Sequence, residues 1–152
     1  MTEDSNGQLV LLKLEGDQIS RYWELIKEGI LEAVKPEEDY TQVLTNILRS
    51  LLSGQMQCWV VVYEGEPKAI FTTAIQVEVG GVRSLLIYSM TGYNTIGLDI
   101  WKGGLKYLRR FAKLQKCEKI VAYSNVERVL QVARLVGGET EYTFISIPVE
   151  EK

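Results

Sequence analysis

Three consecutive β-prone runs in the middle of the chain place the strongest constraint on its fold. Residues Met56 to Tyr63 are aromatic and β-branched, and the runs Lys68 to Val79 and Val82 to Met90 have a similar character. The turn Glu64-Gly65-Glu66-Pro67 separates the first two runs. Gly80-Gly81 predicts a two-residue hairpin loop between the others, because such loops need positive φ. The sequence therefore predicts a three-stranded antiparallel meander.

A strand and two helices are expected before the meander. The apolar run from Gln8 to Leu14 predicts a buried strand, and Asp17 is a plausible N-cap for a helix that ends at Lys35-Pro36. Asp39 and Gln42 resemble a capping box that opens a second helix, which stops at Ser53-Gly54. The inward stripe of the first helix is Ile19, Tyr22, Trp23, Ile26 and Ile30.

After the meander the period of the apolar residues changes. Leu98 to about Lys116 has helical spacing, Lys119 to Tyr123 is a short strand, and Val126 to Val136 is a helix ended by glycines. Thr140 to Val149 alternates and predicts a closing strand. The expected order is β-α-α-β-β-β-α-β-α-β, an α/β domain over residues 1–152 with a mostly antiparallel mixed sheet flanked by helices. Residues 1–7 are expected to form a disordered tail.

The composition excludes several kinds of chemistry. The chain of 152 residues has no histidine, which rules out a Ser-His-Asp relay and imidazole metal ligands, and we expect no metal site. Its two cysteines, Cys58 and Cys117, are far apart and indicate a reducing compartment rather than a disulfide scaffold. The acidic N-terminus does not resemble a secretory signal, and no apolar run reaches the ~20 residues of a membrane span. We expect a cytoplasmic protein.

Charge is unevenly distributed along the chain. Leu98 to Lys119 holds seven bases and two acids, a net charge of +5, so the remainder carries −8 of the total of −3. A solvated helix face is the usual explanation of such spacing; the alternative is an anionic partner. That partner would be the phosphates of coenzyme A, an acidic protein surface or, least favoured in an acidic chain, nucleic acid. The stripe consists of Lys102, Lys106, Arg109, Lys113 and Lys116.

The segment from Leu105 to Asn125 resembles the GCN5-related N-acetyltransferase (GNAT) superfamily. It has a long helix, the turn Lys116-Cys117-Glu118, a strand ending at Tyr123-Ser124 and an immediate further helix. The whole element order fits the same superfamily, and the chain is similar to small GNAT-like proteins of phage and prophage genomes. The resemblance implies acyl-coenzyme A, as acetyl-CoA or CoA, as cofactor, with Asn125 contacting its pantetheine arm. An N-cap role is the alternative for Asn125.

The phosphate-binding turn of the superfamily has a degenerate match here. Backbone N–H groups at a helix N-terminus suit a pyrophosphate, and the nearest match to the family pattern is Asn94-Thr95-Ile96-Gly97-Leu98-Asp99. The resemblance assigns cofactor binding to Asn94, Thr95 and Gly97. Asn94 is a shorter amide at the first position of the family pattern, and Asp99 stands where the family has a small residue. An ordinary strand-to-helix loop is therefore the competing interpretation. A second register runs from Asp99 to Gly104.

The tyrosine that superfamily members often use as the acid in the last helix is missing. Tyr88 and Tyr123, on the strands that flank the family's cofactor groove, are therefore the catalytic candidates, although buried structural aromatics are common in strands. Tyr93 is a further phenol, and Glu78 is a candidate base. Met90 ends the strand expected to hold pantetheine.

Two functions of different classes follow from these observations. The first is transfer of an acyl group from acyl-CoA to a small-molecule or protein amine by direct attack. The second is a catalytically inactive GNAT-fold binding or assembly protein, possible in a phage-related setting, that uses the basic stripe. The degenerate motif and the missing acid favour the second more than the resemblance alone does.

Overall fold

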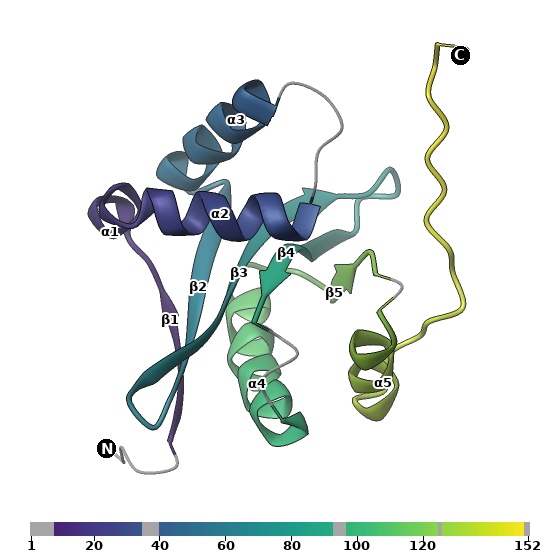
Figure 1. Cartoon of the computed structure of the whole chain (residues 1–152). Helices are drawn as coiled ribbons and strands as arrows, with labels where there is room; N and C mark the ends of the chain where they lie inside the picture. Colours follow the sequence, from purple (N-terminus) through teal and green to yellow (C-terminus); the bar gives the residue numbers. More distant parts are fainter. Residues whose placement is uncertain (1–7, 35–39, 93–96, 125, 151–152) are drawn as a thin grey trace. The chain divides into compact units, whose positions relative to one another are not determined.

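A computed structural model describes residues 8–34, 40–92, 97–124 and 126–150 of the chain (Figure 1). The chain divides into two compact units, one ending at Ala122 and one beginning at Tyr123. The elements of the first unit are β1 (Leu9–Lys13), α1 (Gly16–Arg21), α2 (Trp23–Val34), α3 (Tyr40–Ser53), β2 (Met56–Tyr63), β3 (Glu66–Val77), β4 (Arg83–Thr91), α4 (Leu98–Leu114) and β5 (Lys119–Ala122). The second unit contains α5 (Glu127–Leu135). No helix among the described residues is long and apolar enough to span a membrane.

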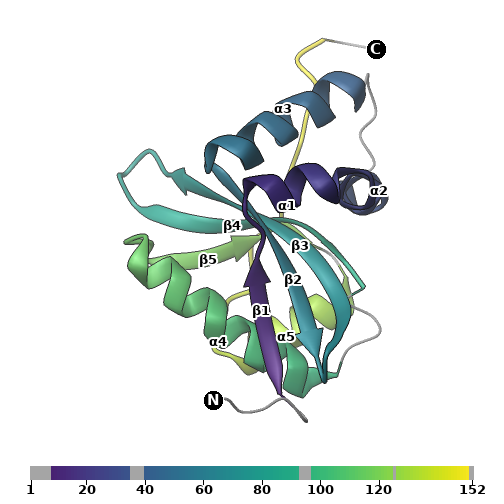
Figure 2. The same ribbon diagram turned by 90° about the vertical axis from the view of Figure 1, so that its left-hand side faces the viewer.

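The first unit is built on a mixed sheet of five strands in the order β1-β2-β3-β4-β5. The pairs β1–β2, β2–β3 and β3–β4 are antiparallel, and β4–β5 is parallel. Helix α4 lies on one face of the sheet, and α1, α2 and α3 lie on the other (Figure 2). The predicted α/β class and the mostly antiparallel sheet flanked by helices are confirmed.

Each face of the sheet has its own core. On the α4 face, Trp59 stacks with Phe71 at 6.2 Å and meets Phe111 edge-on at 5.0 Å. On the other face, Ile26 and Ile30 of α2 pack with Cys58, which is fully buried. Because successive residues of a strand point to opposite faces, Cys58 and Trp59 fall into different cores.

The predicted first helix is divided in two. Helix α1 is capped at Glu15 rather than Asp17, because Gln18 Oε1 accepts the Glu15 N–H at 2.8 Å. It ends at Arg21; the C-cap Tyr22 has φ of −104° and ψ of 18°, which are not helical, and α2 begins at the next residue. The apolar stripe runs through both helices, so periodicity alone does not reveal the break. Asp39, the other predicted cap, lies outside the described residues.

The hairpin between β3 and β4 is longer than predicted. The strands end at Val77 and restart at Arg83, and the Glu78 N–H bonds to the Val82 carbonyl at 2.8 Å. Only Gly81 of the glycine pair has positive φ, at +90°. The two-residue loop was therefore wrong: a single left-handed residue closes this wider turn.

The second unit corrects the prediction of a closing strand. Helix α5 ends with Gly137 at φ +89°, as expected for a glycine stop. Residues 139–148, however, have no regular secondary structure, and Tyr142 and Ile147 are more than three-quarters exposed. Alternation shows that a segment could line a sheet, but a strand also needs a neighbouring backbone to bond. The sequence pattern does not show whether one is present.

Candidate functional site

Strand β4 extends beyond its parallel partner. The register joins Ser84 to Lys119 and ends where Ile87 meets Ala122, whereas β4 continues to Thr91. Within the described part of the chain, β5 therefore leaves the last four residues of β4 unpaired on that side. Backbone N–H and C=O groups on such an edge are strong hydrogen-bonding groups that seek partners. The open edge is the backbone feature on which a ligand could form strand-like hydrogen bonds.

A β-bulge at Tyr88 marks the start of this open edge. In the ladder with β3, Thr72 pairs with Ser89 and Thr73 pairs with Ile87, so Tyr88 is the extra residue. The bulge reverses the alternation: Ile87 and Met90 both contact the α4-side core, although they are three residues apart. The bulge in β4 thus lies where the pairing of β4 with β5 ends.

The Tyr88 side chain points to the α2 side of the sheet. It is half-buried and packs against the core formed by α1, α2 and α3. Burial raises the pKa of its phenol above the usual value of 10, because water no longer stabilises the phenolate. The phenol is therefore protonated at neutral pH and can donate a proton rather than accept one.

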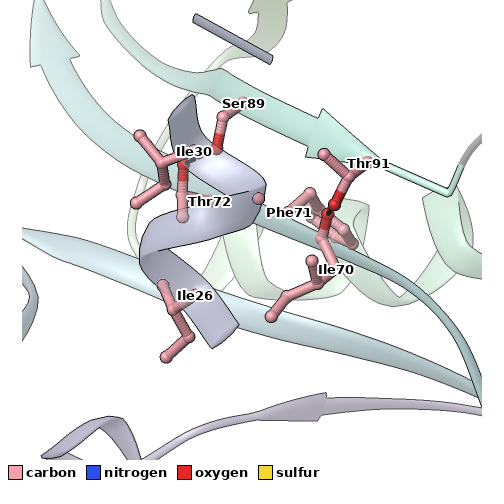
Figure 3. A pocket seen from close by; sticks show the side chains of 8 residues that line it. Ile26, Ile30, Ile70, Phe71, Thr72, Ser89 and Thr91 are labelled. Carbon is pink, nitrogen blue, oxygen red and sulfur yellow. Dashed lines mark hydrogen bonds between the residues drawn. The ribbon is translucent and has the colours of Figure 1, made fainter. Parts of the chain in front are cut away.

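Two buried hydroxyls follow the bulge beneath α2. Thr72 Oγ1 and Ser89 Oγ lie 2.6 Å apart, and both line a cavity of about 10 Å³ (Figure 3). Thr91 lines the same cavity, and its hydroxyl donates to the Ile70 carbonyl at 3.4 Å. A volume of this size holds about one water molecule. The cavity therefore serves packing and polar satisfaction, and it is too small for a substrate.

The first turn of α4 forms a second part of the candidate site. Gly97 is the N-cap, and its carbonyl accepts the Trp101 N–H at 3.1 Å. Since glycine has no side chain, it does not cap the other N–H groups of the first turn, and such groups at a helix N-terminus suit an anion. Asp99 is exposed, so its charge is screened by solvent. Asn94, Thr95 and Tyr93 lie outside the described residues.

The structure does not bring all the predicted site residues together. Met90 and Gly97 border the open end of β4 and the start of α4, which are close in the chain. Tyr123 belongs to the second unit, where its ring lies 4.6 Å from that of Phe144. Asn125 lies outside the described residues; the N-cap of α5 is Val126.

Two other candidates are placed away from the open edge. Glu78 forms an ion pair with Lys119 at 3.3 Å, beside the first β4–β5 pair rather than the last. The alternative phosphate register from Asp99 to Gly104 lies inside α4, where Gly103 packs closely against Leu9.

The basic stripe is an exposed face of α4, as its spacing predicts. Lys102, Lys106, Arg109 and Lys113 lie on the helix, and Lys116 follows it with φ of +61°. All five residues are exposed. No group of three or more carboxylate or thiol side chains among the described residues is arranged to hold a metal ion.

Sequence patterns missed the bulge that begins the open edge and the pair of buried hydroxyls beside it. The bulge leaves a trace in the run Ser84 to Thr91, where apolar side chains stop alternating regularly, but a break of this kind also occurs at strand ends. The paired hydroxyls of Thr72 and Ser89 come from different strands, and their meeting depends on the bulged register.

Comparison with known proteins identifies the fold. No protein-family model and no curated protein sequence matches the chain. A predicted acetyltransferase from Clostridium acetobutylicum, solved with acetyl-CoA, is 20% identical with a TM-score of 0.64, over 93% of this chain and 97% of that one. A putative acetyltransferase from Pyrococcus furiosus is 20% identical with a TM-score of 0.66, over 93% and 100%.

A third structure has a bound aminoglycoside. The aminoglycoside acetyltransferase meta-AAC0020, from an uncultured soil metagenomic sample and solved with sisomicin, is 15% identical with a TM-score of 0.67, over 95% of this chain and 97% of that one. At these identities the comparisons establish the fold alone. The chain has the α/β fold of GNAT acetyltransferases.

Proposed function

We propose that this protein is an acyl-CoA-dependent N-acyltransferase that acts on an amine. The observation that carries the proposal is the open edge of β4 from Tyr88 to Thr91, which begins at a bulge and leads into the uncapped first turn of α4. An extended pantetheine arm fits a strand edge, and a pyrophosphate fits a helix N-terminus. The fold of the acetyltransferases named above supports the same assignment.

The binding roles follow the two parts of the site. The N–H groups of the first turn of α4, together with Gly97, Asn94 and Thr95, would hold the pyrophosphate. The edge of β4 near Met90 would hold the pantetheine arm, with Asn125 as a further contact. The space around Gly97 is open, since a Cβ there would meet no atom within 4 Å. This open space is compatible with a pyrophosphate of coenzyme A at the start of α4.

The chemistry requires little from side chains. Bound acyl-CoA supplies a thioester whose carbonyl carbon can be attacked by an amine, with no covalent intermediate on the protein. A backbone N–H of the β4 edge would donate to the thioester oxygen and stabilise the charge that develops there. The protonated Tyr88 phenol would supply a proton to the departing sulfur, and Tyr123 is the alternative donor. Without histidine, the amine proton would pass to water or a carboxylate.

The acceptor would be a small-molecule amine, with a protein amine as the alternative. A neighbour of the same fold binds sisomicin, which supports the small-molecule class. Activity assays with a panel of small-molecule and protein amines would identify the acceptor.

Thermal shift and calorimetry with acetyl-CoA and CoA test the proposal. A ligand present at one hundred times its dissociation constant adds ~2.7 kcal/mol to the unfolding free energy. The pair Gly97→Asp and Gly97→Ala sharpens the test: aspartate caps the first-turn N–H groups and repels a pyrophosphate, whereas alanine adds neither a cap nor a charge and has open space for its Cβ. We expect the Asp variant alone to lose CoA binding while its helix remains intact. Absence of heat and shift in the unmodified protein at millimolar CoA would overturn the proposal.

An anion-binding role is the second candidate, and the exposed α4 stripe favours it. In this alternative the fold carries out no chemistry and binds an acidic partner through Lys106, Arg109 and Lys113. Heparin retention is a suitable probe. Reversing these three charges should abolish retention, and unchanged retention would assign the stripe to solvation alone.

A further inference from the structure

A second, larger cavity lies where β2 begins, away from the open edge of β4. Its volume is about 300 Å³, the lower end of the range for small-molecule sites. It lies wholly within the first unit and shares no residue with the candidate acyl-transfer site. Its apolar lining includes Ile19, Leu51, Met56 and Phe111, and Gln57 and Gln115 are among its polar residues.

Gln57 is held in one orientation by a chain of hydrogen bonds. The Trp59 indole N–H donates to Thr73 Oγ1 at 2.9 Å, and an indole can only donate. The Thr73 hydroxyl hydrogen is therefore free to donate to Gln57 Oε1, which lies 2.7 Å away. The amide oxygen is thus fixed toward Thr73, and Nε2 is fixed on the side of the Gly54 carbonyl, to which it donates at 3.1 Å.

This orientation leaves a preorganised donor at the cavity. Gln57 is only 6% exposed and lines the cavity. Its Nε2 carries two hydrogens, and the Gly54 carbonyl takes one of them. The second hydrogen can donate to a ligand in the cavity, and because Gln57 is already held in place, little side-chain freedom is lost when that bond forms.

The electrostatics of the cavity select the kind of acceptor. The C-terminal ends of α3, at Ser53, and of α4, next to Gln115, both line the cavity, and helix C-termini carry partial negative charge. The N-terminus of the six-residue α1, at Glu15 and Gly16, lines it as well, but there a capping box with Gln18 already engages backbone N–H groups. Lys13 and Glu15 at its rim form an ion pair at 3.4 Å and offer no net charge. These surroundings disfavour a carboxylate and favour a neutral carbonyl oxygen.

We propose that this cavity binds a small neutral molecule that presents a carbonyl oxygen to Gln57 Nε2 and packs an apolar group against Leu51, Met56 and Phe111. Acetanilide has both features: a neutral amide carbonyl and a phenyl ring. Benzoate has a similar ring but a negative charge, which makes it the matched control for the electrostatic selection.

Amide and indole NMR resonances report binding directly. Trp59 is linked to Gln57 through Thr73 and contacts Phe111, so its indole N–H should shift together with the Gln57 side-chain amide. Trp23 and Trp101 do not line the cavity, and their indole resonances should stay in place. We expect a saturable shift with millimolar acetanilide, in the range of fragment affinities, and at least tenfold weaker binding of benzoate.

Two variants test whether Gln57 Nε2 binds the carbonyl oxygen. Gln57→Leu should abolish acetanilide binding; Thr73→Val keeps the Gln57 side chain but releases its orientation, and should weaken binding. Absence of any shift at the Gln57 amide and the Trp59 indole with acetanilide overturns the proposal, and so does benzoate binding of equal strength. The titration uses no CoA, so its result is independent of the acyltransferase assignment.

Discussion

Stability above pH 9 should depend on the thiol of Cys58. This side chain is fully buried in the core under α1, α2 and α3. Burial raises the pKa of the Cys58 thiol from its usual value of 9.0 to about 12, because the thiolate is poorly stabilised away from water. The unfolded chain then releases this proton at a lower pH than the folded chain.

The sign and size of the effect follow from linkage. Below pH 9 the thiol is protonated in both states, and its contribution to stability is fully present. Between pH 9 and about pH 12 only the unfolded state ionises, so stability falls with rising pH. Three pKa units correspond to about 4 kcal/mol at the end of this window, and roughly two-thirds of that is lost by about pH 11.

Denaturant unfolding of matched variants isolates this contribution. Cys58→Ala removes the titrating group, so its unfolding free energy should fall less between pH 8 and pH 11 than that of the unmodified protein, by about 3 kcal/mol. Cys117→Ala keeps Cys58 and should show the full decline. The argument is refuted if Cys58→Ala and the unmodified protein lose stability in parallel.

Three further predictions concern the glycines of α4, Gly92 after β4, and Tyr88 as the proposed catalytic acid. Gly104 lies inside α4 with open space around it, so Gly104→Ala should add about 1 kcal/mol by denaturant unfolding, and Gly103→Ala should add less because it meets Leu9. Equal gains would contradict the close packing of α4 on β1. Gly92→Ala should cost more than about 1 kcal/mol, since φ is +83° and the new Cβ would lie 2.5 Å from the Lys68 carbonyl. An unchanged melting temperature would contradict that backbone conformation. Tyr88→Phe should lower kcat about 100-fold with little change in stability. Because the pKa of Tyr88 is raised, loss of its proton should not lower the rate of the unmodified enzyme below pH 10. Equal kcat values for the unmodified enzyme and Tyr88→Phe would rule out Tyr88 as the acid.

The regular elements of the sheet and the helices were largely predictable from the sequence. Strand β2 has the predicted bounds, and α4 begins at the predicted Leu98, because both carry a strong periodic pattern over many residues. The division of the first helix at Tyr22 was not predictable, since its apolar stripe continues through both helices. Boundaries of this kind are set by local capping and packing.

The candidate site was less predictable because it depends on register. Simple alternation places Tyr88 and Met90 on one face, but Tyr88 is the bulged residue, so the two side chains reach opposite cores. The orientation of Gln57 depends on Thr73 of β3, which in turn accepts from Trp59 of β2. Each of these two hydrogen bonds joins residues fourteen or more positions apart in the chain. The exposed segment with Tyr142 and Phe144 shows the converse, a strand pattern without a strand.

Backbone amide NMR with CoA tests the central claim most directly. If the open edge of β4 and the first turn of α4 form the cofactor site, CoA should shift the amide resonances of Tyr88 to Thr91 and of Leu98 to Ile100. The Gly97→Asp variant should lose these shifts, and Gly97→Ala should keep them. Shifts confined to other segments, or no shifts at millimolar CoA, would contradict the assignment of this edge as the acyl-CoA site.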